Sequence, residues 1–322
     1  MNVQQIMPIV EIATIPQVCE TESLIIPADN QPIKLATFEK RRWPYILTLP
    51  ISWLLTLYVM AKKGIYKLFG ISGPSINTFW FDGLGSSNRK IKEGAASWKA
   101  LDIIYNYRFG ESLLNIVDDF WIGMMNAQAV RNRFKLVKQE LRRAILKFSN
   151  YEEVRLISLA CGSAQAVIEL IAELKLKRII VRVILIDIDQ SALDHAKDLG
   201  RQHGVSDQIE MVKASVSQVI KVSRNFRPQI IEMLGLLDYI PQEKAIRLAA
   251  KIRESLDSNG VFLTGNIASN PERHFLDWVI NWQMIYREPA DLVEIANRAG
   301  FSDYRLIYEP LKIHGVVVAQ KA

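Results

Sequence analysis

The C-terminal half of this 322-residue chain is predicted to be an α/β domain with a doubly wound, mostly parallel sheet. Short apolar runs alternate there with helical periods, from VRLISL at 154–159 to GVFLTGN at 260–266. Such alternation is typical of parallel strands joined by crossover helices. The last two runs, 304–309 and 314–321, are too close together for a crossover and predict an antiparallel hairpin. The prediction is a seven-stranded sheet with this hairpin at its edge, preceded by an α-helical N-terminal region.

The expected elements follow one another from residue 150 onward. Strands are expected at 154–159, 181–187, 209–212, 228–234, 260–266, 304–309 and 314–321. One helix is expected to follow the turn after the first strand and to end at residue 174. Further helices are expected at 190–203, 241–256, 272–284 and 289–299. Short apolar runs bounded by turn residues predict the strands, whereas apolar residues at three- and four-residue steps predict the helices.

The remainder of the chain divides into an arm and a helical, basic region. Residues 1–39 contain four prolines and no sustained period, which predicts an extended arm. Residues 71–92 are rich in turn formers and are expected to form a loop. Apolar and aromatic side chains recur at helical spacing over 95–148, which fits either a core layer or a lid over a pocket. The domain boundaries are therefore 1–39, 40–148 and 149–322.

The segment 43–69 has three alternative interpretations. Its first part, 43–61, is uncharged and close to the length of a membrane span, but two prolines interrupt it. Its polar residues share one stripe of a helix: Ser52, Thr56, Lys63 and Lys67. This pattern predicts an amphipathic helix with a cationic face, which lies on a membrane or on another protein surface. A buried helix and a true span are the alternatives.

Charge is distributed unevenly along the chain. Residues 40–150 carry 18 Lys and Arg against 7 Asp and Glu, while the rest carries 22 against 27. The basic region could meet phosphates, lipid headgroups or an acidic substrate, or could be a solvated helical surface. Two cysteines, Cys19 and Cys161, supply neither a disulfide framework nor a zinc site, and no secretory leader is visible. We therefore expect a cytoplasmic protein. The scattered histidines predict no metal site.

The turn after the first strand is the first candidate ligand site. Residues 160–164 leave that strand at the carboxyl edge of the sheet, where open α/β sheets bind ligands. The side chains of the turn are small enough for a ligand to approach the backbone. Neither the dinucleotide spacing G-x-G-x-x-G nor a P-loop occurs. Asp187 ends the second strand, where a carboxylate can accept both hydroxyls of a ribose. Capping of the next helix by Asp187 or Asp189 is the alternative.

These stretches resemble the class I S-adenosylmethionine-dependent methyltransferases. LISLACGSA is similar to the first motif of that superfamily, and VILIDIDQSALDHAKDLG is similar to the second. IEMVKASVSQV, RPQIIEMLGLLDYIPQEKA and IRESLDSNGVFLTGNI resemble the third, fourth and fifth motifs, so the likeness covers about 150–322. The resemblance implies S-adenosylmethionine as the cofactor, with Gly162 against its amino-acid moiety. The implied cofactor residues are Ala160, Cys161, Gly162, Ser163, Asp187, Ile188, Ser215 and Gly235, with Arg131 or the nearby Arg133 on the methionine carboxylate.

Four residues depart from the superfamily's pattern. Ala160 and Ala164 stand where glycines are usual, and Ser158 stands where an acid is common. Ser215 stands where an Asp often meets the adenine amine. Alanine can replace glycine if its φ stays negative, and a serine hydroxyl can still hydrogen-bond adenine. We therefore expect cofactor binding to be retained.

The loops after the fourth and fifth strands are expected to hold the methyl acceptor. A sulfonium methyl is already activated, so an enzyme of this class chiefly aligns the acceptor and excludes water. The candidate catalytic residues are Asp238, Tyr239 and Tyr286, and the candidate substrate residues are Asn266, Trp282 and Arg287. Helix capping and core packing are the alternative roles. Of the histidines, His274 is expected nearest to the pocket.

The leading prediction is a methyltransferase for a small-molecule or lipidic acceptor, with contact to a membrane surface as a further possibility. The basic excess lies in a hydrophobic, aromatic-rich segment, no RNA-binding module is visible, and no Asn/Asp-Pro-Pro-aromatic motif occurs. These observations disfavour nucleic acid. An RNA methyltransferase that uses the basic region as its platform is one alternative. A non-catalytic, membrane-associated cofactor-binding protein is the other. We also expect the helices of 95–148 to close over the cofactor site and select the substrate.

Overall fold

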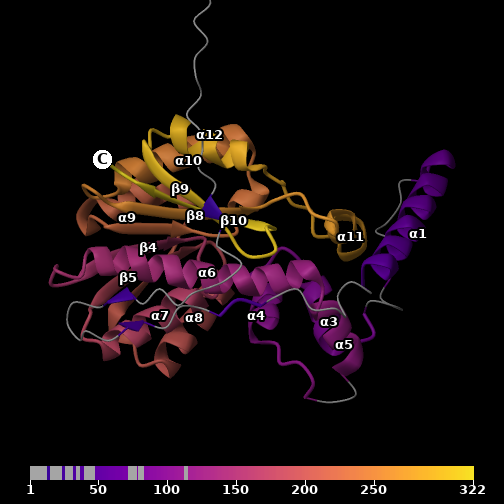
Figure 1. Ribbon diagram of the computed structural model, residues 1–322, viewed down its shortest axis with the longest axis horizontal. Helices are drawn as coiled ribbons and strands as arrows, with labels where there is room; N and C mark the ends of the chain where they lie inside the picture. Colours follow the sequence, from indigo (N-terminus) through magenta and orange to yellow (C-terminus); the bar gives the residue numbers. More distant parts are fainter. Residues whose placement is uncertain are drawn as a thin grey trace, which may run out of the picture.

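A mixed sheet forms the centre of the molecule, with helices on both faces and a further group of helices beyond one of its ends (Figure 1). The computed structural model describes residues 13–14, 24–25, 32–33, 37–39, 48–71, 78, 83–111 and 115–322. In the arm, the described residues include a short antiparallel pair, β2 (Leu24–Ile25) and β3 (Pro32–Ile33).

The predicted seven-stranded sheet is confirmed, in the order β9-β10-β8-β7-β4-β5-β6. Its strands are β4 (Val154–Leu159), β5 (Val181–Asp187), β6 (Ile209–Lys213), β7 (Ile230–Met233), β8 (Val261–Ile267), β9 (Asp303–Tyr308) and β10 (His314–Gln320). β4 to β8 run parallel, and β10 lies antiparallel between β8 and β9. A two-residue strand from the arm, β1 (Ala13–Thr14), pairs with β9 and makes the sheet eight-stranded.

Helices cover both faces of this sheet. They are α6 (Met125–Lys147), α7 (Gln165–Leu176) and α8 (Gln190–Gln202) on one face, and α9 (Val219–Phe226), α10 (Gln242–Ser255) and α12 (Pro289–Arg298) on the other. Each face has its own apolar core because strands buried on both sides present apolar residues in both directions. Because β4 to β8 are parallel, their carboxyl ends lie at one edge of the sheet.

The prediction of a loop over 71–92 is wrong for its last residues, because α3 (Ser86–Glu93) begins within that range. The signal for this helix is not local. The Asp118 carboxylate accepts the backbone N–H of Ser87 at 3.1 Å and that of Asn88 at 2.9 Å. A residue about thirty positions away thus satisfies the first turn of α3. The next helices are α4 (Trp98–Asn106) and α5 (Ile116–Ile122).

The helix expected over 272–284 is shorter in the structure. A single turn, α11 (Arg273–Phe275), continues as a π-helical turn, η6 (Leu276–Ile280). Asn281 then adopts a φ of +62°, which ends the helix. Residues 281–288 continue without helix up to α12.

Helix α1 (Thr48–Leu68) projects from the body beside α11 (Figure 1). The first half of the polar stripe faces protein, since Ser52 is 0% exposed and Thr56 is 6% exposed, whereas Lys67 in its second half is exposed. Each of these hydroxyls donates to a carbonyl of α1 itself, so burial leaves neither without a partner. The apolar side carries Leu54 and Leu57, which are 68% and 60% exposed. Within the described part of the chain, α1 included, no helix is long and apolar enough to cross a bilayer.

Candidate active site

A cavity of about 460 Å³ opens at the carboxyl edge of the parallel strands. The turns after β4, β5 and β7 form its floor, and residues of α3 to α6 and of α11 form its walls. Its size lies within the range of small-molecule and cofactor sites. The basic N-terminal helices therefore border the same space as the predicted cofactor turn.

The turn 160–164 is strained at its two alanines. Ala160, Gly162 and Ala164 have φ values of +50°, +53° and +51°. The expectation that the alanines keep a negative φ is therefore wrong. Left-handed backbone costs an L-residue about 1–2 kcal/mol, and such strain persists mainly at functional sites. Gly162 carries a second constraint, since a Cβ built on it would lie 3.1 Å from the Cβ of Trp98.

Asp187 and Asp189 have separate roles at the end of β5. Asp189 caps α8, because its Oδ1 accepts the backbone N–H of Ser191 at 2.8 Å. Asp187 accepts the N–H of Gly162 and the N–H of Asp189, each at 2.9 Å. The Asp187 carboxylate thus links the end of β5 to the Gly162 turn and also lines the cavity. A carboxylate has about four acceptor positions, so it can still accept hydroxyl groups of a ligand.

The other predicted cofactor residues divide into those that line the cavity and those that do not. Cys161, Ser163, Ile188 and Gly235 lie in its lining, together with Ala160 and Gly162. Burial beside Asp187 raises the pKa of the Cys161 thiol well above its usual value, so it is a neutral wall residue. Ser215 is exposed outside the lining and accepts the N–H of Ser217.

Arg131 also lies outside the main cavity. Its guanidinium forms two hydrogen bonds of 2.9 Å to the Glu39 carboxylate and one to the carbonyl of Ile122. Arg133 lies about 200° further round α6 and does line the cavity. Of the two arginines that the sequence offered for the cofactor carboxylate, only Arg133 reaches the cavity.

Glu232 is a cavity residue that the sequence reasoning missed. β7 pairs with β4 so that Glu232 stands opposite Ser158, and the Ser158 hydroxyl donates to its Oε1. Burial raises the pKa of Glu232 to about 7. The neighbouring strand therefore supplies an acid beside the position where the superfamily's first motif usually has one. The available signal was an acid inside the apolar run IIEM.

A second polar group lines the cavity beyond β7. Arg133 Nη1 lies 3.8 Å from Asp238 Oδ2, and Arg133 Nη2 donates to the hydroxyl of Tyr105 at 3.3 Å. Burial raises the pKa of Asp238 to about 6, although the Arg133 charge opposes this shift. Both ring nitrogens of His314 lack a hydrogen-bond partner among the described residues. Burial and the Arg133 charge keep the pKa of His314 well below its usual value, so its imidazole is neutral.

His314, not His274, is the histidine of the cavity. His274 is exposed and lies outside the lining. β10 runs antiparallel to the other strands, so its first residue lies at the edge where the parallel strands end. The sequence contained this signal, since the hairpin was predicted, but its consequence for His314 was missed.

Of the predicted catalytic and substrate residues, Asp238, Tyr239 and Trp282 line the cavity. Trp282 Nε1 donates to the Tyr239 hydroxyl at 2.7 Å. That hydroxyl keeps its own proton for donation to a ligand. Tyr286 lies outside the lining, where its hydroxyl donates to Asp277 at 3.3 Å.

Asn266 and Arg287 also lie outside the lining and are almost completely buried. Arg287 Nη1 donates to Asn266 Oδ1 at 2.6 Å and to the carbonyl of Leu237 at 2.5 Å, and Nη2 donates to the carbonyl of Ile240 at 2.6 Å. These bonds fasten the loop that carries Asp238 against the end of β8. In this structure the pair supports the cavity wall and does not face its interior.

The sequence identifies the class of protein. Residues 83–321 match the Methyltransf_20 family, described as "Putative methyltransferase", and the chain belongs to this family. Among curated proteins, none matches the sequence significantly.

Solved structures with the same fold include three that cover most of this chain. A protein of Bordetella parapertussis described as a possible exported protein shares 17% identity at a TM-score of 0.61, over 73% of this chain and 86% of its own. Magnesium protoporphyrin IX methyltransferase of Synechocystis PCC 6803, with bound S-adenosylhomocysteine, shares 13% identity at a TM-score of 0.51, over 76% of this chain and 99% of its own. The carbon methyltransferase CurJ shares 13% identity at a TM-score of 0.50, over 76% of this chain and 68% of its own. These likenesses confirm the predicted methyltransferase fold.

Proposed function

We propose that the protein is an S-adenosylmethionine-dependent methyltransferase, of EC class 2.1.1, for a small-molecule or lipidic acceptor. The observation that supports this most is the strained 160–164 turn bonded to Asp187 within a cavity at the carboxyl edge of the sheet. Asp187 has acceptor capacity left for ribose hydroxyls, and the backbone of the Gly162 turn lines the same cavity. Both features fit S-adenosylmethionine.

The residues of the cavity can align an acceptor and exclude water. S-adenosylmethionine supplies an activated sulfonium methyl when bound. His314 is neutral and its ring nitrogens have no partner among the described residues, so it can hydrogen-bond the hydroxyl or amine of an acceptor. Arg133 can hold a negative or developing negative charge on that acceptor. The wall formed by Trp121 and Trp282 excludes water from the cavity.

Calorimetric titration of the purified protein with S-adenosylmethionine tests this proposal. Asp187→Ala should weaken binding by on the order of 2–4 kcal/mol, because it removes two charge-assisted hydrogen bonds to the ribose. Asp194→Ala, an exposed acid on α8, is the control and should bind like the wild type. Wild-type protein that binds no S-adenosylmethionine would refute the function. Equal affinity of the two variants would refute the role of Asp187.

We further propose that α1 places the protein on an anionic membrane surface, which favours a lipidic acceptor. Trp53, Leu57 and Leu68 are 53%, 60% and 85% exposed, and Lys62 and Lys67 lie on the same helix. Apolar side chains with lysines beside them suit the interface of a bilayer with negative headgroups.

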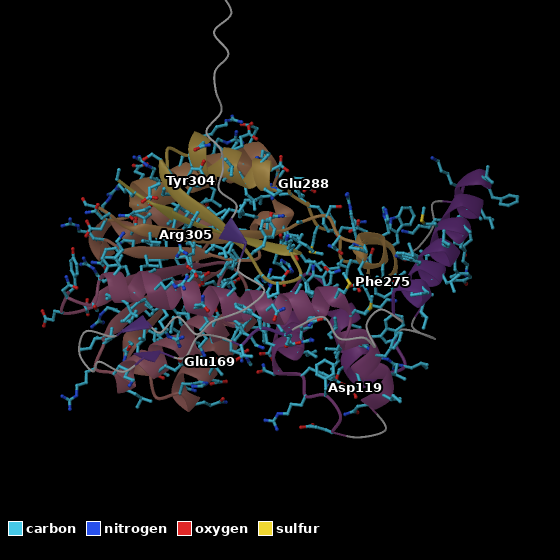
Figure 2. All side chains as sticks on the ribbon, in the orientation of Figure 1. Asp119, Glu169, Phe275, Glu288, Tyr304 and Arg305 are labelled. Atoms are coloured by element: carbon cyan, nitrogen blue, oxygen red, sulfur yellow. The ribbon has the colours of Figure 1, made fainter. Side chains whose placement is uncertain are left out.

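The position of α1 connects this surface to the cavity. Leu55 and Val59 on its buried side belong to one apolar cluster with Trp121 and Phe275, and these two aromatics line the cavity. Their rings stack at 5.3 Å, and Phe275 lies on α11, next to α1 (Figure 2). A helix docked on a membrane would therefore hold the cavity wall close to the lipid surface.

Flotation with vesicles tests the docking proposal. The protein should float with vesicles of phosphatidylcholine and phosphatidylglycerol, less with pure phosphatidylcholine, and less again in high salt. Leu57→Glu should abolish flotation, while Leu176→Glu, at a leucine of α7 that is even more exposed, should not. A wild type that stays in the lower fraction with both lipids would contradict the proposal. If the same variant instead dissociated a dimer, α1 would be a contact between copies of the chain.

A further inference from the structure

We propose that Glu232 binds the primary ammonium of the methionine moiety of S-adenosylmethionine. This inference rests on the proposed function and adds a cofactor residue to it. Glu232 lines the same cavity as Gly162 and Asp187, and it belongs to β7, on the other side of β4 from Asp187.

The surroundings of Glu232 call for a cation that the described residues do not supply. Its side chain is 5% exposed, and its only hydrogen bond among the described residues comes from the Ser158 hydroxyl to Oε1. No described Lys, Arg or His lies within ion-pair distance of it. A buried carboxylate without a cationic partner is costly. A cationic group of a ligand would remove that cost, and an ammonium has three donors for the remaining acceptor positions.

The strand order gives the direction in which the cofactor would lie. The edge of the sheet runs from β5 through β4 to β7, so Asp187, the Gly162 turn and Glu232 follow one another across about two strand spacings, roughly 10 Å. A ligand with its ribose on Asp187 and its chain passing Gly162 brings its amino-acid end to β7. There it meets Glu232.

Ser158 acts as the positioning residue in this arrangement. It faces Glu232 across the β4–β7 pair and is fully buried, so its hydroxyl holds Oε1 while Oε2 accepts no hydrogen bond from any described residue. The pair therefore places a carboxylate of β7 at the edge of the sheet, although β4 has Ser158 where an acid is usual.

Calorimetry with three ligands separates the ammonium from the rest of the cofactor. S-adenosylmethionine carries the ammonium and the sulfonium, S-adenosylhomocysteine carries the ammonium only, and 5′-methylthioadenosine carries neither. Glu232→Gln should weaken the binding of the first two ligands by a similar factor, about 10- to 100-fold. Its affinity for the third ligand should stay within about twofold of the wild-type affinity. Glu210→Gln, an exposed acid on β6, is the matched control and should change none of them.

Each outcome decides the inference. Equal affinity of Glu232→Gln and wild type for S-adenosylhomocysteine would overturn it, and so would an equal loss for 5′-methylthioadenosine. A loss for S-adenosylmethionine alone would assign Glu232 to the sulfonium and also overturn it. Wild-type protein that binds none of the three ligands would refute the proposed function itself. If Glu232→Gln does not fold, Glu232→Asp should show the same ligand-dependent pattern with a smaller factor.

Discussion

At the scale of single residues, the site holds several groups in states that cost stability. Ala160 and Ala164 adopt positive φ angles, and Glu232 and Asp238 are buried carboxyl groups with raised pKa values. His314 is buried with both nitrogens unpaired among the described residues. Folding alone does not favour these backbone conformations and buried polar groups, and all of them lie around one cavity. Such concentration is expected where the structure is adapted to bind a ligand.

Relief of the turn strain should stabilise the protein. Ala164→Gly is expected to raise the free energy of unfolding by up to about 1 kcal/mol, because the left-handed penalty exceeds the added entropy of glycine in the unfolded chain. Ala172→Gly, inside α7, should instead lower it by about 1 kcal/mol. Urea denaturation of both variants measures the difference. A loss of stability in Ala164→Gly equal to that in Ala172→Gly would show that position 164 is not strained.

The buried Glu232 should give the ligand-free protein a characteristic pH dependence. Its pKa is about 7 in the folded protein against an ordinary value of 4.5. Between these two values the folded state keeps a proton that the unfolded chain releases, so the stability contributed by Glu232 is lost as the pH rises through 7. The expected slope is about 1.4 kcal/mol per pH unit.

Glu232→Gln removes this titration. The free energy of unfolding, measured by denaturation without ligand, should therefore rise in the variant relative to the wild type as the pH increases from 5 to 7.5. A difference between the two proteins that stays constant over this range would contradict the raised pKa.

At the scale of elements, distant side chains fasten the N-terminal helices to the sheet. α6 begins at Met125, and the Glu272 carboxylate accepts the N–H groups of Met125 and Asn126 at 3.0 and 2.8 Å. Glu272 follows β8 and is fully buried. Its negative charge lies at the positive end of the α6 dipole. One carboxylate therefore joins the layer that carries Arg133 to the loop that carries α11.

Loss of this cap should destabilise the protein clearly. Glu272→Ala is expected to cost about 2–3 kcal/mol, because it leaves buried N–H groups of α6 unpaired. Glu288→Ala removes an exposed cap of α12 and should cost about 1 kcal/mol or less. Thermal unfolding of both variants compares the two sites. A smaller effect at Glu272 than at Glu288 would show that the α6 cap does not hold the layers together.

At the scale of the whole molecule, the sequence predicts what local patterns determine. The bounds of β4 and β5 and the placement of Gly162 and Asp187 at one cavity follow from short apolar runs and from the rule that parallel strands end at one edge. The pairing of Glu232 with Ser158 depends on strand register, which no single stretch contains. The cap of α3 by Asp118 and the inward-facing Ser52 and Thr56 of α1 depend on packing between distant segments. Physical pattern reasoning on one sequence does not reach such contacts.

Hydrogen–deuterium exchange with and without S-adenosylmethionine tests the central claim most directly, namely that the cofactor lies at the carboxyl edge beneath the N-terminal helices. We predict slower exchange in four segments whose residues line this cavity: 160–167, 187–189, 232–239 and α4. Asp187→Ala should reduce the protection in all four at the same ligand concentration, while exchange in α12 stays unchanged. Protection that spares 160–167 and 187–189, or no protection at saturating cofactor, would contradict the account.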